Sequence, residues 1–302
     1  MPGPEAPGGP RAWFAAAGVL LAMTGPAAAV DVSSLWDFGH PEESERRFRR
    51  ALESASGDDA LILRTQIART YGLRGDFGRA RAELDAIAPQ VPSAGAEVRV
   101  RHALERGRTY ASATHPAHSQ TAQSREIARG HFEEAWRHAR EASLDALAID
   151  AIHMLAFVDP APADQLKWGR EALAVVEAST QPDAWRWEAS VRNNVGYALH
   201  RLGRYDEALD QFEKALRLRR QAGNAEATRV AEWMVAWTLR ALGRGDEAIG
   251  IQLRLERECD AAGRPDPHVF EELEILFRAK GEEERARHYA DRRKLAAQEP
   301  AK

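Results

Sequence analysis

Apolar and small residues recur along this chain in a pattern that repeats after 40 positions. The stretch from Leu202 to Leu209 (LGRYDEAL) returns from Leu242 to Ile249 as LGRGDEAI. A sequence period of 20 to 50 residues is typical of one supersecondary unit stacked on copies of itself. Each unit then contacts mainly its neighbours, so one array can extend over a chain of this length. The pattern therefore predicts an all-α solenoid rather than two globular domains.

The repeated stretch predicts a turn between two antiparallel helices. Gly203 is expected to have a positive φ angle, because glycine ends a helix in the left-handed conformation without steric cost. Asp206 is expected to cap the helix that follows. The small residues Gly196 and Ala208 are expected to let the two helices approach closely.

The segment from Asn193 to Leu216 resembles a tetratricopeptide repeat. That family's signature is W-x2-L-G-x2-Y followed by A-x3-F and P. The matching residues here are Val195, Gly196, Leu199, Ala208 and Phe212, whereas Arg192 stands in the Trp place. The resemblance implies a right-handed α-solenoid of stacked antiparallel hairpins over residues 33–297, with residues 298–302 as a tail.

Weaker copies of the motif surround the strongest one. The residues that open each second helix are Ala80, Ala135, Trp168, Ala208, Ala248 and Ala286. Most of their spacings are close to 40 residues, which resembles the extended repeats of kinesin-light-chain-like arrays. About six hairpins are expected, with a leading half repeat whose helix begins at Pro41. The copy that contains Ala248 departs from the motif at Gln252, where a large apolar residue is expected.

One spacing, between Ala80 and Ala135, is longer than the local period by about 15 residues. It predicts an insertion at residues 112–124 (SATHPAHSQTAQS), which are polar and lack helical periodicity. Deleting this insertion is expected to leave the fold standing, because added loop length costs little free energy.

Composition adds few constraints on function. The chain has 302 residues, of which 44% are hydrophobic and 29% charged, and its net charge is −4. Basic and acidic residues are interspersed, so the sequence provides no basic stripe for nucleic acid. A single cysteine, Cys259, excludes a disulfide within the chain.

The first 29 residues have the pattern of a secretory signal peptide. An apolar run from Trp13 to Met23 is broken by Gly25-Pro26 and followed by three alanines. Eleven apolar residues are too few for a comfortable membrane span. Export in a bacterium, to the periplasm or the medium, is therefore expected, with no stable membrane insertion after cleavage. The alternative is a cytoplasmic regulator or adaptor whose N-terminus is not cleaved.

The resemblance also implies where a partner would bind. In such repeats certain places of each first helix face a concave groove. The residues at those places are His153, Asn193, Asn194, Tyr197, His200, Arg201, Trp233, Met234, Trp237 and Arg240. The same places of the repeat are occupied by Asp150 in an earlier copy and by Glu272 in the last copy. Amides that pair with an extended backbone, beside aromatic rings, favour a peptide or protein partner.

Two alternatives for these groove residues stay open. Trp233 and Trp237 lie four residues apart on one helical face and can equally fill the space between helices. Asn194 matches a place used to bind a peptide's terminal carboxylate, but the lysines expected in neighbouring copies are missing.

Enzymatic functions are not favoured. The sequence has no nucleophile-elbow, phosphate-loop or dinucleotide-binding motif. His115, His118, His131 and His138 are candidate zinc ligands, but they lack the convergent spacing of zinc sites. We therefore expect a non-enzymatic interaction module or scaffold without metal or cofactor. A metal-dependent enzyme and a homo-oligomeric array are the remaining alternatives.

Overall fold

The computed structural model describes residues 30–298. The chain divides into a unit of residues 1–31 and a unit of residues 32–302, and the second unit contains all of the helices below. The predicted signal peptide, residues 1–29, lies outside the described residues. So do residues 299–302 of the predicted tail.

The described residues are helical and contain no strand. The helices are α1 (Val32–Leu35), α2 (Pro41–Leu52), α3 (Gly57–Leu73), α4 (Phe77–Ile87), α5 (Ala96–Arg108), α6 (Ala122–Glu141), α7 (Asp145–Val158), α8 (Pro162–Ala178), α9 (Pro182–Trp185), α10 (Glu188–Arg201), α11 (Tyr205–Gln221), α12 (Ala225–Ala241), α13 (Gly245–Ala261), α14 (Pro267–Ala279) and α15 (Glu283–Gln298). Two 3-10 turns, η1 (Val91–Ser93) and η2 (Ala117–Ser119), lie in the loops.

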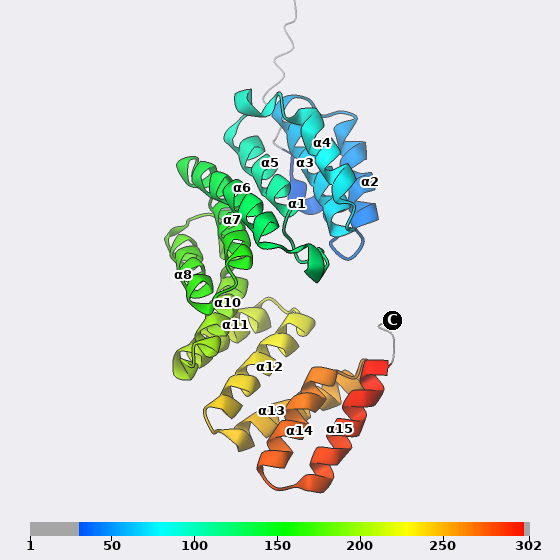
Figure 1. Cartoon of the computed structure of the whole chain (residues 1–302), viewed down its shortest axis with the longest axis vertical. Coiled ribbons are helices and arrows are strands. Elements are labelled where there is room, and N and C mark those ends of the chain that lie inside the picture. The colour runs from blue at the N-terminus through cyan, green and yellow to red at the C-terminus, as the bar shows by residue number, and fades with distance from the viewer. Residues whose placement is uncertain (1–29, 299–302) are drawn as a thin grey trace, which may run out of the picture. The chain divides into compact units, whose positions relative to one another are not determined.

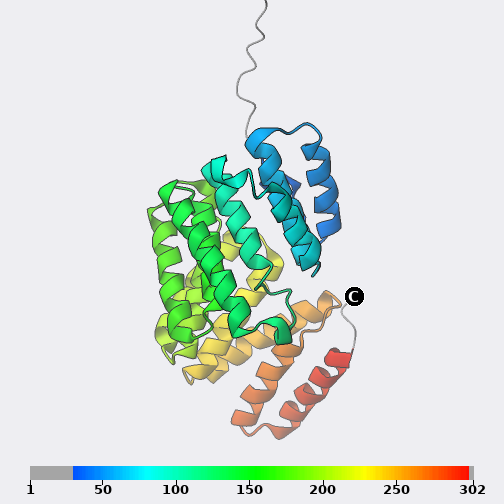
Figure 2. The same ribbon diagram turned by 45° about the horizontal axis from the view of Figure 1, so that its top comes forward.

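The helices pair into consecutive hairpins, from α3 and α4 to α14 and α15, and each hairpin packs on the next one. Figure 1 shows this succession, and Figure 2 shows the last two helices running side by side in opposite directions. The helix α2 begins at Pro41 and packs on α3 as the predicted half repeat. The prediction of an all-α array of stacked hairpins is confirmed.

Small residues make the close helix contacts that the sequence predicts. Ala208 and Ala248 are fully buried at equivalent places of α11 and α13. A Cβ atom built on Gly196 would lie 2.8 Å from the ring of Phe212, which is itself fully buried. Helix α10 therefore approaches α11 to a distance that only glycine permits at this place.

The turn after α10 is a Schellman motif. Gly203 has a φ angle of 73°. Its N–H donates to the His200 carbonyl, and the Arg204 N–H donates to the Leu199 carbonyl. Both bonds satisfy carbonyl groups that a helix end leaves unpaired. Gly243 repeats this geometry, with a φ angle of 76°.

The predicted cap at Asp206 is wrong. Helix α11 begins at Tyr205, so Asp206 lies inside the first turn and Arg204 is the N-cap without a side-chain hydrogen bond. The tight turn at Gly203 starts the second helix two residues earlier than the cap assignment assumed. The acidic side chains of the first turn still stabilise the positive end of the helix dipole.

The predicted insertion differs from expectation in two ways. Helix α6 begins at Ala122, so the last three residues of the insertion are helical. The remainder packs on the first hairpin, because the Thr114 hydroxyl donates to the Gly72 carbonyl over 2.9 Å. The His115 ring also stacks on Phe77, with ring centroids 3.7 Å apart. The loop is therefore held by specific contacts, and we revise the expectation that its deletion costs little.

Among residues 30–298, no helix combines the length and the apolar character needed to cross a bilayer.

Candidate functional site

The predicted partner-binding residues lie on the first helices of three successive hairpins, α7, α10 and α12. Positions four and seven residues apart share one face of a helix, and the equivalent positions recur 40 residues later. We call this surface the first-helix face and define it by His153, Asn193, Asn194, Tyr197, His200, Arg201, Trp233, Met234, Trp237 and Arg240.

Aromatic rings form the centre of the first-helix face. The Trp237 ring on α12 stacks on Tyr197 and His200 of α10, with centroid distances of 6.0 and 3.3 Å. It also stacks on Trp233, one helical turn away, at 5.8 Å. Tyr197 is 40% exposed, whereas the other three rings are partly buried. The rings thus pack between repeats, as one interpretation of the tryptophans predicts, and that they bind a partner stays a prediction.

His200 is the most perturbed titratable group on the first-helix face. Burial lowers the pKa of His200 to about 4, and the nearby positive charge of Arg240 contributes in the same direction. The buried Nε2 atom has no hydrogen-bond partner among the described residues. The imidazole is therefore neutral at physiological pH and behaves as part of the aromatic stack.

A small apolar pocket opens beside the aromatic rings, between α7, α8 and α10. Its volume is about 150 Å³. The apolar lining is formed by Ile152, Ala156, Phe157, Trp168, Ala172, Trp187 and Val191. Three predicted site residues, His153, Asn194 and Tyr197, also line it. The Asn194 amide nitrogen lies 3.3 Å from His153 Nδ1 and so links α10 to α7. An apolar pocket with an amide and a hydroxyl suits one apolar side chain of a partner.

The arginines of the first-helix face are already engaged. Arg240 donates two hydrogen bonds to the Glu272 carboxylate on α14, at 2.7 and 2.9 Å. Arg201 donates to the Pro160 carbonyl over 3.4 Å, and its guanidinium lies 5.9 Å from the Tyr197 ring centroid. Asn193 is partly buried, and its side chain makes no hydrogen bond within residues 30–298. Arg240 thus fixes the neighbouring hairpin rather than offering a free positive charge.

A buried charge cluster was missed by the sequence analysis. Arg108 on α5 forms ion pairs with Glu105 and with Asp150 of α7, and Arg69 of α3 lies 3.8 Å from Asp150. Burial alone raises the pKa of Asp150, but the charges of Arg108 and Arg69 outweigh it and hold the pKa below its usual value. Asp150 therefore joins three hairpins and is not a groove residue. Its partner is 42 residues away, so no local pattern signals the pair.

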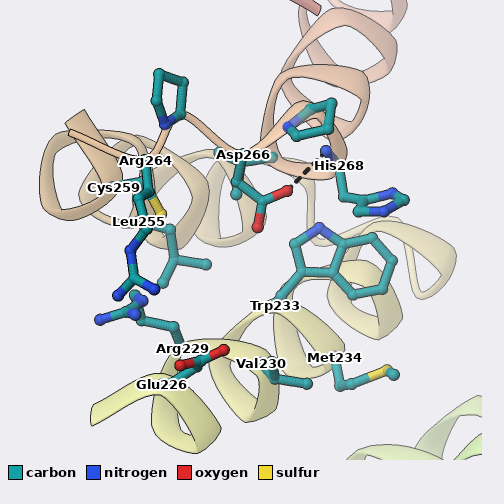
Figure 3. Close-up of a pocket in the computed structure, with 13 residues that line it drawn as sticks. Glu226, Arg229, Val230, Trp233, Met234, Leu255, Cys259, Arg264, Asp266 and His268 are labelled. Atoms are coloured by element: carbon teal, nitrogen blue, oxygen red, sulfur yellow. Dashed lines mark hydrogen bonds between the residues drawn. The ribbon is translucent and has the colours of Figure 1, made fainter. Parts of the chain in front are cut away.

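A larger pocket lies where α12, α13 and α14 meet (Figure 3). Its volume is about 480 Å³. Trp233 and Met234 of the first-helix face line it, together with Cys259, which is buried in α13. Burial raises the pKa of the Cys259 thiol, so the group stays protonated and unreactive. Sequence reasoning did not find this pocket, because its walls come from separate helices and from the loop before α14.

Over residues 30–298, no three His, Cys, Asp or Glu side chains gather closely enough to hold a metal ion. The four histidines weighed as zinc ligands have other surroundings. His115 stacks on Phe77, and His131 stacks on Tyr110. His118 is exposed in the loop, and His138 lies near the carboxylates of Glu134 and Glu141.

Comparison with known families decides what the repeat is. Residues 187–255, which span α10 to α13, match the family model of the tetratricopeptide repeat. Residues 187–255 are tetratricopeptide repeats. The match covers the strongest copy found in the sequence and the copy that follows it. The aromatic centre of the first-helix face, from Tyr197 to Trp237, lies within these repeats. A comparison with curated protein sequences found no match.

Solved structures share the fold of the tetratricopeptide array. A signal-transduction ATPase with a tetratricopeptide repeat sensor from Pyrococcus horikoshii has a TM-score of 0.65 at 12% identity, covering 85% of this chain and 39% of that one. A Rap protein complexed with competence and sporulation factor has a TM-score of 0.54 at 12% identity, covering 88% of this chain and 73% of that one. NprR in complex with its cognate peptide NprX has a TM-score of 0.51 at 13% identity, covering 89% and 78%. This chain thus spans about two fifths of the first of these structures. At such low identities the likeness concerns the fold alone.

Proposed function

We propose that this chain is a non-enzymatic interaction module that binds an extended peptide segment of a partner protein on the first-helix face. The observation that carries the proposal is the continuous aromatic and amide surface from Asn194 through Tyr197 to Trp237. Tyrosine and tryptophan provide a large contact area at low entropic cost, and they are enriched among residues that dominate binding energy. Amide side chains satisfy the polar groups of a bound extended backbone.

The pocket beside these rings supports the same proposal. A cavity of about 150 Å³ can hold one six-membered ring, as an engineered cavity of that size holds benzene. A peptide that lies along Asn194 and Tyr197 would place one apolar side chain in it. NprR, which has the same fold, is described in complex with a cognate peptide, and this likeness supports a peptide as the partner class.

A random peptide library displayed on phage tests the proposal. The immobilised chain is expected to enrich peptides that carry a large apolar residue. The double variant Asn194→Ala, Tyr197→Ala is expected to bind the enriched peptides about tenfold or more weakly, with helicity unchanged. The control is Ile127→Ala on α6, because Ile127 has the same exposed fraction as Tyr197, 40%. Equal binding by the double variant would place the binding surface elsewhere.

We also propose that residues 1–29 are removed on export, on the basis of the sequence pattern alone. Expression in a Gram-negative host, followed by intact mass measurement of separate cell fractions, tests this. A periplasmic protein lacking residues 1–29 supports export, and a full-length cytoplasmic protein contradicts it.

A further inference from the structure

The pocket between α12, α13 and α14 has the size and lining of a small-molecule site. Its volume of about 480 Å³ lies within the usual range of ligand pockets, roughly 300–1,000 Å³. Val230, Trp233, Leu255 and Val269 provide apolar walls. The chain before α14 is stiffened by two prolines, Pro265 and Pro267, which restrict their backbone φ angles. The pocket is therefore formed before any ligand arrives.

Two positive charges in this pocket have no partner. Neither the Arg229 nor the Arg264 guanidinium makes a hydrogen bond or an ion pair with any residue between Val30 and Gln298. Figure 3 shows both groups directed toward the same part of the pocket. Other arginines that link hairpins, such as Arg240, pair with carboxylates. Two unpaired guanidiniums that line one pocket repel each other, and an anion between them would offset that repulsion.

Another lining residue, Trp233, provides a third unsatisfied donor. The indole N–H of Trp233 is buried and finds no acceptor within residues 30–298. A buried donor without an acceptor costs free energy, which a ligand oxygen would recover. The unmatched groups of the lining are thus these donors and the exposed Glu226 carboxylate, which also makes no ion pair within residues 30–298. The two guanidiniums and the indole N–H suit an acceptor that carries an apolar body.

The acidic residues of the lining restrict the charge of the ligand. Asp266 and Glu226 also line the pocket, and the Asp266 carboxylate accepts the His268 N–H as the cap of α14. The charges of these two acids and of the two arginines sum to zero. Asp266 and Glu226 would repel a dianion, such as a phosphate monoester, more strongly than a monoanion.

We infer that this pocket binds a small organic carboxylate whose apolar body packs against Trp233, Val230 and Leu255 while its carboxylate lies between Arg229 and Arg264. Guanidinium groups match the planar geometry of a carboxylate and bind it through two parallel hydrogen bonds. The inference does not rest on the proposed peptide function, because Arg229 and Arg264 lie outside the first-helix face, although Trp233 and Met234 belong to both sites.

Calorimetric titration of the full chain tests the inference with three probes of defined chemistry. The probes are 3-phenylpropionate, its uncharged isostere 3-phenylpropionamide, and inorganic phosphate. We expect saturable binding of the acid, binding of the amide weaker by about tenfold or more, and no binding of phosphate. Equal affinity for acid and amide, affinity for phosphate as high as for the acid, or no saturable binding of the acid up to about 10 mM would overturn the inference.

Variants then locate the site. Arg229→Gln and Arg264→Gln are each expected to weaken binding of 3-phenylpropionate by about tenfold, because each removes a charge-assisted hydrogen bond. The matched control is Arg257→Gln, because Arg257 is an exposed arginine of α13 that does not line the pocket. Trp233→Phe keeps an aromatic wall but removes the N–H, and it is expected to weaken binding as well. Unchanged binding by the double variant Arg229→Gln, Arg264→Gln would also overturn the inference.

Discussion

Gly196 on α10 and Phe212 on α11 meet so closely that an added Cβ atom would lie 2.8 Å from the phenyl ring. The ring is fully buried. Gly196→Ala is therefore expected to destabilise the chain by about 1–3 kcal/mol through overpacking. Denaturant unfolding followed by circular dichroism measures the change.

A second glycine provides the control. Gly250 lies in α13, and a Cβ atom there would meet nothing within 4 Å. Gly250→Ala is expected to raise the free energy of unfolding, by up to about 1 kcal/mol, because alanine favours the helix. If the two substitutions had equal effects, the close approach of α10 and α11 at Gly196 would be contradicted.

Gln252 occupies the place in α13 that Phe212 occupies in α11, and it is fully buried. Neither its amide nitrogen nor its amide oxygen has a hydrogen-bond partner in residues 30–298. Replacing a buried, unsatisfied amide by an apolar group of similar volume removes its desolvation cost. Gln252→Met is therefore expected to raise the free energy of unfolding by about 1–3 kcal/mol. A lower stability of this variant would mean that Gln252 is satisfied in solution.

His200 makes the stability depend on pH. Its pKa is lowered from 6.5 to about 4 in the folded chain. Above pH 6.5 the imidazole is neutral in both states. Between pH 6.5 and 4 the unfolded chain binds a proton that the folded chain does not bind, so the free energy of unfolding falls as the pH falls.

Solvent screening at this partly exposed site reduces the His200 effect to on the order of 1 kcal/mol. His200→Gln is expected to remove this part of the pH dependence. Unfolding at a series of pH values measures it, with a nuclear magnetic resonance titration of the imidazole as an independent check. A folded-state pKa close to 6.5 would contradict the burial of the ring.

The loop between α5 and α6 is expected to contribute to stability through His115. His115→Ala removes the stack on Phe77 and is expected to cost about 1 kcal/mol. The control is His118→Ala, three residues further along in the same loop, because His118 is exposed. Thermal unfolding compares the two variants. Equal melting temperatures would restore the view of this loop as a dispensable insertion.

Much of the array could be predicted from the sequence, because a helix-ending glycine or a small packing residue acts on neighbours within a few positions. The positive φ of Gly203 and the close approach at Gly196 both follow from repeat positions visible in the sequence. Two local details failed, namely the cap at Asp206 and the start of α6 inside the predicted insertion. Helix ends depend on how the turn closes, which the residue pattern alone does not specify.

Contacts between distant residues could not be predicted. Asp150 pairs with Arg108 across two hairpins, and Arg229 and Arg264 reach one pocket from different elements. The positions of the first-helix face could be selected by counting along the repeat. Which of them are exposed, such as Tyr197, and which are engaged, such as Arg240, depends on packing between hairpins.

The most direct test of the account uses the indole N–H resonances of the chain labelled with nitrogen-15 tryptophan. A peptide enriched by the phage selection is added, and the tryptophan signals are followed. Binding on the first-helix face predicts large shifts for Trp237 and Trp233 and for Trp187 in the small pocket, with Trp36 and Trp185 unchanged. Shifts confined to Trp36, Trp136 or Trp185 would contradict the account and place the binding surface away from α10 and α12.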